Sequence, residues 1–206
     1  DIVDQAAVFF GDRLDLALLA LIQDEAKIRA TFGAGVTLQT FLAAALDDAE
    51  GPLDIVVTGH SKGGALSSTV ALWLAETQGA VVPPEERWDP ARRARIHCFS
   101  FAGPTPGNAA FARRSSQVLG PRHLRVWNAL EVVPHAWTAD GLLEIPDLYS
   151  PAIARIPALA ELVDVIRART EPLGYTHLNG RTRQFRGALA NRHLFFDELA
   201  YQHKHA

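Results

Sequence analysis

A serine at the centre of a glycine-rich turn is the residue of this chain whose surroundings point most directly to chemistry. Ser61 is the middle residue of GHSKG at 59–63, a match to the pattern G-x-S-x-G. The apolar run at 55–57 predicts a strand buried on both faces, and residues 65–74 carry apolar side chains at helical spacing. A serine held on a strained turn between a strand and a helix is typical of a catalytic nucleophile.

The same turn provides groups that stabilise negative charge beside the serine. The N–H groups at the start of a helix carry partial positive charge, and the backbone N–H of Lys62 is the predicted donor of one half of an oxyanion hole. Gly59 and Gly63 are expected where the strand and helix backbones approach closely, because glycine has no Cβ. The alternative interpretation of GHSKG is an ordinary glycine-rich turn without chemistry.

A serine hydroxyl becomes nucleophilic when a histidine removes its proton, and a carboxylate must orient that histidine. Folds with this type of turn place the acid, and then the histidine, after the serine in the chain. Glu131 follows the predicted strand at 123–127 and is the predicted acid, with Asp140 and Asp147 as alternatives. Chain order excludes three histidines as the base, namely His60, His97 and His123. Four histidines remain, and spacing alone does not choose among the last three: His177, His193, His203 and His205.

Composition places the chain among globular proteins and limits its partners. Its 206 residues fit a single domain, 1–206, and 48% of them are apolar, which is enough for a sizeable core. The net charge of −3 argues against nucleic acid or an anionic membrane surface as the main partner. No apolar run reaches the roughly 18 residues of a membrane span. The lone Cys98 lies in an apolar strand-like run and is predicted to be a small buried hydrophobe.

Predicted strands and helices alternate along the rest of the chain, which indicates an α/β fold with a largely parallel sheet flanked by helices. Strands are predicted at 96–101, 123–127 and 175–185, and helices at 14–29, 37–49, 109–119, 157–169 and 188–201. The proline-rich stretch 79–95 predicts an exposed loop. Residues 139–169 form either a wall or cap of an acyl pocket or an ordinary crossover segment. The carboxyl ends of the strands should bring Ser61, 103–108 and 128–135 to one edge of the sheet.

Four segments together resemble bacterial members of the class 3 lipase family, which are α/β-hydrolase-like serine esterases acting on acylglycerols and related esters. These segments are GHSKGG at 59–64, FAGPTPGNAAFA at 101–112, NALEVVPHAW at 128–137 and YQHKHA at 201–206. The resemblance covers roughly residues 53–206. It implies Ser61 as the nucleophile, Glu131 as the acid and His203 as the base. It also implies a lipid or small ester as the substrate, with neither a metal nor an organic cofactor.

The chain departs from the family pattern at two points. Glu131 stands where the family usually has aspartate, so its loop must sit farther back by the length of a methylene group. The family's second oxyanion donor belongs to an arginine–glycine–threonine-like motif, and nothing before residue 53 matches that motif, so the second donor is unassigned. The chain begins at Asp1 and contains no methionine, which predicts that an N-terminal part with its strands is missing.

Two other functions fit the same motifs. A hydrolase-fold module that binds a partner without catalysis is one alternative, and the missing upstream oxyanion donor is the feature that favours it. An acyltransferase with the same triad is the other, and it differs in how water is excluded during deacylation. The sequence does not indicate the oligomeric state, the localisation or the preferred acyl chain.

Overall fold

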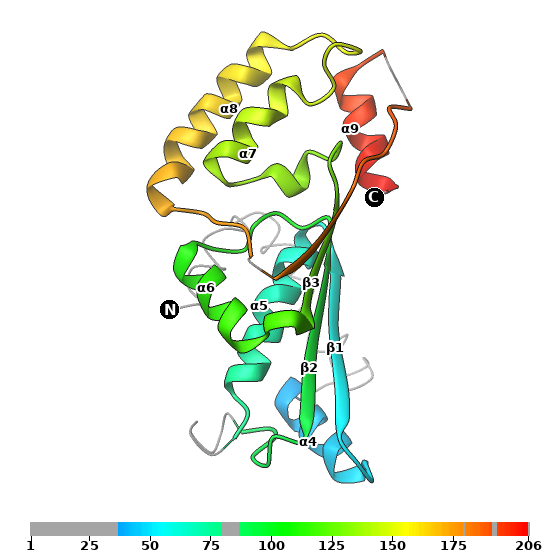
Figure 1. Ribbon diagram of the computed structural model, residues 1–206, viewed down its shortest axis with the longest axis vertical. Helices are drawn as coiled ribbons and strands as arrows, with labels where there is room; N and C mark the ends of the chain where they lie inside the picture. Colours follow the sequence, from blue (N-terminus) through cyan, green and yellow to red (C-terminus); the bar gives the residue numbers. More distant parts are fainter. Residues whose placement is uncertain (1–36, 80–86, 179, 191–192, 206) are drawn as a thin grey trace, which may run out of the picture. The chain divides into compact units, whose positions relative to one another are not determined.

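The computed structural model describes residues 37–79, 87–178, 180–190 and 193–205 (Figure 1). Within them, residues 37–55, 76–79 and 87–95 form one compact unit, and residues 56–75, 96–178, 180–190 and 193–205 form another. The helix predicted over 14–29 lies outside the described residues. The prediction of a single domain over 1–206 stays a prediction.

The first unit contains α4 and residues 87–95, which lead into the second strand of the sheet. α4 spans Leu38–Asp48, and the Thr37 hydroxyl caps it by accepting a hydrogen bond from the Thr40 N–H at 3.1 Å, which confirms the helix predicted over 37–49. The prediction of an exposed loop over 79–95 is wrong for its second half, because Asp89 is only 2% exposed. Its carboxylate accepts hydrogen bonds from Gln78 Nε2 and from the Ala94 N–H, and these bonds hold the connection against the unit.

Among the described residues the sheet has four strands in the order β1-β2-β3-β4. The strands span Leu53–His60 (β1), Ala94–Phe101 (β2), His123–Asn128 (β3) and Arg181–Phe185 (β4). β2 pairs with β3 in parallel, with Cys98 opposite His123, and β3 pairs with β4 in parallel. The parallel sheet is therefore confirmed, and its carboxyl edge is where a ligand site is expected.

Two helices cover the same side of the second unit's strands. α5 spans Lys62–Glu76 and α6 spans Ala109–Val118, and Figure 1 shows both beside β2 and β3. The side chain of Cys98, on the covered side of β2, is fully buried, as predicted. The prediction that β1 is buried on both faces is wrong, because its residues alternate between half-buried and exposed and Val56 is 55% exposed.

A separate helical layer follows β3 in the chain. It contains α7 at Ala139–Glu144, α8 at Pro157–Thr170 and α9 at Phe195–Lys204, the second of which confirms the helix predicted over 157–169. Their apolar faces share a cluster of buried residues: Leu142, Ile145, Tyr149, Ile153, Val163 and Phe195. Short 3-10 helices lie at Gly120–Arg122, Val133–His135, Ile145–Asp147 and Glu171–Leu173. None of the helices in the described residues is long and apolar enough to cross a membrane.

Two predicted elements have different bounds in the structure. The strand predicted over 175–185 is limited to β4, and Tyr175 instead forms an isolated antiparallel bridge to Asn108. The helix predicted over 188–201 begins later and extends farther, as α9. Residues 188–190 are not helical because α9 side chains bind their backbone: Gln202 Nε2 donates to the Ala188 carbonyl, and Glu198 Oε1 accepts from the Ala190 N–H. Because α9 ends at Lys204, His203 lies in its last turn.

Candidate active site

Ser61 occupies a sharp turn between the last residue of β1 and the first residue of α5. Its φ angle of 59° lies in the left-handed region, which a serine occupies only when the surrounding structure enforces it. The Ser61 N–H donates to the Phe101 carbonyl at 3.0 Å, and the Ser61 carbonyl accepts from the Gly64 N–H at 2.9 Å. The turn is therefore the strained strand–turn–helix arrangement predicted from the motif.

Close backbone packing around the turn requires glycine at one predicted position and at one position that was not predicted. A Cβ on Gly59 would lie 2.1 Å from the Gly63 carbonyl oxygen, so Gly59 is required as expected. A Cβ on Gly63 would meet no atom within 4 Å, so the Gly63 backbone takes part in this close approach, but the approach does not depend on the missing Cβ of Gly63. A second close approach is made by Gly64, where a Cβ would lie 2.6 Å from the Phe101 carbonyl oxygen. The third glycine of GHSKGG thus lets α5 pack against the end of β2.

Glu131 and His203 form a hydrogen-bonded pair, although 72 positions separate them in the chain. Glu131 lies in the loop after β3, and the Nδ1–H of His203 donates to its Oε1. The Glu131 side chain is fully buried, whereas the His203 side chain is 30% exposed. The structure therefore brings together the predicted acid and the predicted base, with the solvent-accessible imidazole outermost.

The environment of the Glu131 carboxylate favours a positively charged partner. Burial raises the pKa of the Glu131 carboxyl to about 8, because the charged form has lost its hydration. Its second oxygen, Oε2, has no hydrogen-bond partner among the described residues. A poorly solvated carboxylate of this kind gains most from an imidazolium at His203, the state that a base reaches after accepting a proton.

A second set of hydrogen bonds joins the loop of the acid to the helix of the base. Asn128 Oδ1 accepts from the Leu130 N–H in the loop, and Asn128 Nδ2 donates to Gln202 Oε1 at 2.7 Å. Gln202 Nε2 in turn donates to the buried Glu198 carboxylate at 2.6 Å. Sequence reasoning missed Asn128 and Gln202. The signals that pointed to them were an asparagine at the end of a strand and a glutamine directly before the predicted base.

His203 lies beside the serine turn. The ring of His60, the residue before Ser61, has its centroid 5.0 Å from that of His203, with an interplanar angle of 42°. The metal-ligating atoms of His60, Glu131 and His203 all lie within 4.8 Å of one another, so these three residues are the group among the described ones that can hold a metal ion. The hydrogen bond from Ser61 Oγ to His203 Nε2 stays a prediction.

The other candidates for acid and base lie elsewhere. His193 is exposed and precedes α9, and His205 is exposed, with its ring stacked on that of Tyr201 at 4.3 Å between centroids. Asp147 pairs with Arg155 at 3.4 Å on the surface. Asp140 and His177 line a cavity beside α7. Of the acids and histidines that the sequence left open, the structure pairs Glu131 with His203.

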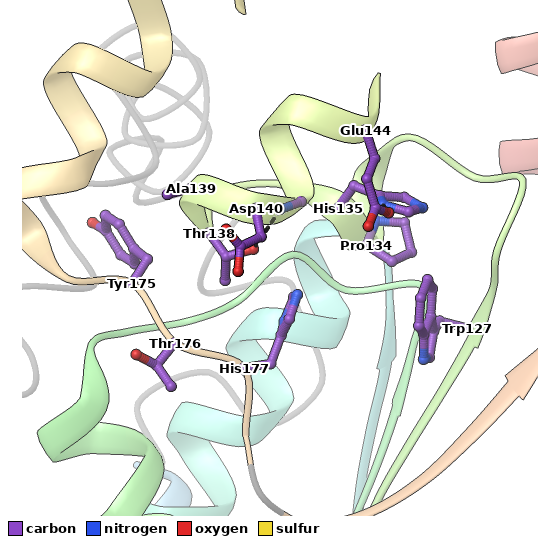
Figure 2. Close-up of a pocket in the computed structure, with 11 residues that line it drawn as sticks. Trp127, Pro134, His135, Thr138, Ala139, Asp140, Glu144, Tyr175, Thr176 and His177 are labelled. Atoms are coloured by element: carbon purple, nitrogen blue, oxygen red, sulfur yellow. Dashed lines mark hydrogen bonds and ion pairs between the residues drawn. The ribbon is translucent and has the colours of Figure 1, made fainter. Parts of the chain in front are cut away.

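The cavity beside α7 has a volume of about 440 Å³ and a mixed lining (Figure 2). Trp127, Pro134, Tyr175 and His177 contribute to its walls, and the His177 ring points toward α7. His135 is fixed at its edge by a contact of 2.9 Å between its Nδ1 and Glu144 Oε2. Burial, together with the nearby Arg125 and His135, lowers the pKa of His177 to about 4. His177 is therefore a neutral, polar wall of this cavity at neutral pH.

A second cavity, of about 520 Å³, lies at the carboxyl ends of β2, β3 and β4. Its lining is mainly apolar and consists of Phe101, Ala102, Val126, Trp127, Asn128, Phe185, Arg186, Gly187 and His205. Phe101 also provides the carbonyl that binds the Ser61 N–H. An apolar cavity thus begins at a residue that positions the serine turn.

A strained serine turn after a strand, an acid after a later strand and a histidine near the C-terminal end, all on a parallel sheet, define the α/β-hydrolase fold. The comparisons with known proteins then identify the family. A sequence model described as lipase (class 3) matches residues 26–140, more than half of the chain, and the chain belongs to this family.

Relatives and solved structures agree with this assignment. The chain is 35% identical over 94 residues to phospholipase A1-Igamma2, chloroplastic, from Arabidopsis thaliana, which covers 43% of this chain and 15% of that protein. It is 39% identical over 84 residues to phospholipase A1-II 6 from Oryza sativa subsp. japonica, covering 40% of this chain and 20% of that protein. The crystal structure of M37 lipase matches with a TM-score of 0.71 at 33% identity, over 83% of this chain and 48% of that one. The matched part is therefore a fifth or less of these plant relatives and about half of the M37 lipase chain.

Proposed function

We propose that this protein hydrolyses carboxylic esters of lipids through an acyl-enzyme formed on Ser61. The observation that carries the proposal is the Glu131–His203 hydrogen bond next to a serine turn with a φ of 59°. The three proposed members of the triad, Ser61, Glu131 and His203, all belong to the second unit and follow the chain order of α/β-hydrolases.

The proposed first half-reaction forms the acyl-enzyme. Ser61 Oγ attacks the ester carbonyl carbon while its proton passes to His203 Nε2, and Glu131 stabilises the resulting imidazolium through Nδ1. The tetrahedral oxyanion accepts a hydrogen bond from the Lys62 N–H at the start of α5. The carbon–oxygen bond to the alcohol then breaks, and His203 returns the proton to the leaving alkoxide.

The second half-reaction repeats these steps with water as the nucleophile. Neutral His203 removes a proton from a water molecule, which attacks the Ser61 ester carbonyl and forms a second oxyanion. Collapse of this intermediate breaks the bond to Ser61 Oγ, which recovers its proton from His203, and a carboxylic acid is released. Over the whole cycle one ester and one water molecule give one alcohol and one carboxylic acid, and Ser61 and His203 return to their starting states.

The proposed substrate is a fatty-acyl ester of a glycerol-containing lipid. The names of the relatives, phospholipase A1 and lipase, support this class. The apolar cavity that includes Phe101, Val126 and Phe185 supports it independently, because it offers a place for an acyl chain next to the serine turn. A binding module without catalysis is disfavoured by Glu131, since burying a carboxylate against a histidine costs stability that binding alone does not require.

The test is labelling with a fluorophosphonate, which reacts with activated serines, followed by mapping of the labelled residue. We expect labelling at Ser61 and hydrolysis of p-nitrophenyl esters, with both lost in Ser61→Ala. The folded state of the variant is checked by its thermal unfolding. Ester hydrolysis that persists in folded Ser61→Ala, or a labelled residue other than Ser61, would overturn the proposal.

A further inference from the structure

His60 is a histidine without a part in the proposed reaction, and yet its ring lies next to the catalytic pair. Its side chain is exposed, and its ring centroid is 5.0 Å from that of His203. Nitrogen atoms of both imidazoles and an oxygen of Glu131 lie within 4.8 Å of one another. We propose that His60 and His203 together bind one divalent metal ion that prefers nitrogen ligands, such as Zn²⁺, and that this ion reversibly inhibits the enzyme.

The Glu131–His203 pair already has the arrangement of a metal-binding histidine. A histidine that ligates zinc usually donates its other ring N–H to a carboxylate, which fixes the tautomer and makes the ligating nitrogen more basic. His203 donates from Nδ1 to Glu131 Oε1. Its Nε2 is therefore presented as a neutral donor, both to a serine proton and to a metal ion.

The spacing of the two rings suits one metal ion between them. With zinc–nitrogen bonds of about 2.0–2.1 Å and tetrahedral angles, two imidazoles on the same ion have ring centroids about 5 Å apart. The observed separation of 5.0 Å and tilt of 42° are close to this arrangement. Because His60 is exposed, water can complete the coordination, and the ion can exchange with solvent.

The donor set also selects among metals. Imidazole nitrogen suits Zn²⁺, Cu²⁺, Ni²⁺ and Co²⁺, whereas Mg²⁺ and Ca²⁺ prefer oxygen ligands. A cation at this site would favour the ionised form of the buried Glu131 carboxyl group, whose Oε2 has no hydrogen-bond partner among the described residues. Zn²⁺ should therefore bind and Mg²⁺ should not.

Inhibition follows from the atom that the metal occupies. A lone pair of His203 Nε2 that is bound to Zn²⁺ cannot accept the proton of Ser61, so acylation stops until the ion leaves. This consequence rests on the proposed function, whereas metal binding itself does not. The two are therefore measured separately.

Binding is measured by calorimetric titration of Zn²⁺ into the Ser61→Ala protein, which is inactive by design. We expect one ion per chain, and the affinity should fall at least about 10-fold when His60→Gln is added, because loss of even an outer-shell partner costs about 10- to 100-fold. The matched control adds His193→Gln, which removes an exposed histidine outside the site and should leave the affinity unchanged. Absence of binding, or equal affinity with and without His60, would overturn the metal site.

Inhibition is measured on a soluble ester, p-nitrophenyl butyrate, so that effects of metal ions on lipid aggregates do not enter. Zn²⁺ should inhibit the unmodified enzyme, EDTA should restore its activity, and Mg²⁺ at the same concentration should have no effect. His60→Gln should keep basal activity and need at least about 10-fold more Zn²⁺ for the same inhibition, whereas His193→Gln should respond like the unmodified enzyme. Equal inhibition of His60→Gln and the unmodified enzyme would overturn the inference, even where ester hydrolysis is confirmed.

Discussion

Glu131 is the residue at which the requirements of folding and of the proposed reaction oppose each other. Its carboxylate is fully buried, and its ordinary pKa of 4.5 is raised to about 8 by that burial. The folded state therefore binds one more proton than the unfolded state between these two pH values. The free energy of unfolding consequently falls as the pH rises from 4.5 toward 8. A residue kept at such a cost points to a role other than stability.

We expect Glu131→Gln to separate these two effects. The amide cannot stabilise an imidazolium at His203, so kcat should fall roughly 10⁴-fold. The same change removes a buried charge, so the free energy of unfolding above the pKa of Glu131 should be equal to or higher than that of the unmodified protein. Ester hydrolysis and urea denaturation at alkaline pH measure the two effects.

Asp147→Asn serves as the control, because Asp147 is an alternative acid that pairs with Arg155 on the surface. It should leave kcat unchanged. A large loss of kcat in Asp147→Asn, or a Glu131→Gln protein that is fully active, would show that the acid is misassigned.

Sequence reasoning could nominate a candidate residue where its context is local, but not where tertiary contacts decide, and the catalytic roles themselves stay predictions. Ser61 was recognisable because strand, turn and helix are adjacent in the chain, and Glu131 because it follows a strand. His203 was not recognisable from spacing, since its partner is 72 positions away, and only the resemblance to a family selected it. The neighbouring position of His60 was equally invisible, because it depends on how α9 returns to the serine turn.

At the scale of elements, the strands β1 and β2 were predictable because each contains an apolar, strand-like stretch. The bounds of α9 were not, because hydrogen bonds from Gln202 and Glu198 hold residues 188–190 out of the helix. The same glutamine binds Asn128 at the end of β3. Gln202 therefore joins α9, which carries the predicted base, to residues 188–190 and to the end of β3, which leads into the loop of the predicted acid.

We expect Gln202→Ala to lower kcat by about 10²-fold with little change in KM, because a displacement of about 1 Å in a catalytic group costs on that order. The change leaves Asn128 Nδ2 and the Ala188 carbonyl without their present partner, so the loop and helix can shift relative to each other. The rate of fluorophosphonate labelling at Ser61 should fall together with kcat. Steady-state kinetics on a soluble ester and the labelling rate measure this.

Gln184→Ala is the matched control, since Gln184 is exposed on β4 and its loss should change neither quantity. A Gln202→Ala protein in which only KM rises would show that Gln202 acts on substrate binding and not on the position of His203.

At the scale of the whole molecule, acid stability depends on histidines that fold into neutral, buried sites. His123 is 2% exposed, and its Nε2 lies 3.3 Å from the hydroxyls of both Ser68 and Ser100. Burial, together with the nearby Arg125 cation, lowers the pKa of His123 from 6.5 to about 4. The unfolded chain therefore binds more protons than the folded chain between these values, and stability is lost as the pH falls from 6.5 toward 4.

From these pKa values we expect His123 alone to reduce the free energy of unfolding by about 2 kcal/mol between about pH 7 and about pH 5. Urea denaturation at the two pH values measures the loss. His123→Gln keeps a side chain that can bond to the Ser68 and Ser100 hydroxyls but cannot be protonated, so its loss over the same interval should be smaller by that amount. His193→Gln, which removes an exposed imidazole, should follow the unmodified protein. Parallel curves for His123→Gln and the unmodified protein would show that acid acts elsewhere, with His177 the next residue to replace because burial lowers its pKa to about 4 as well.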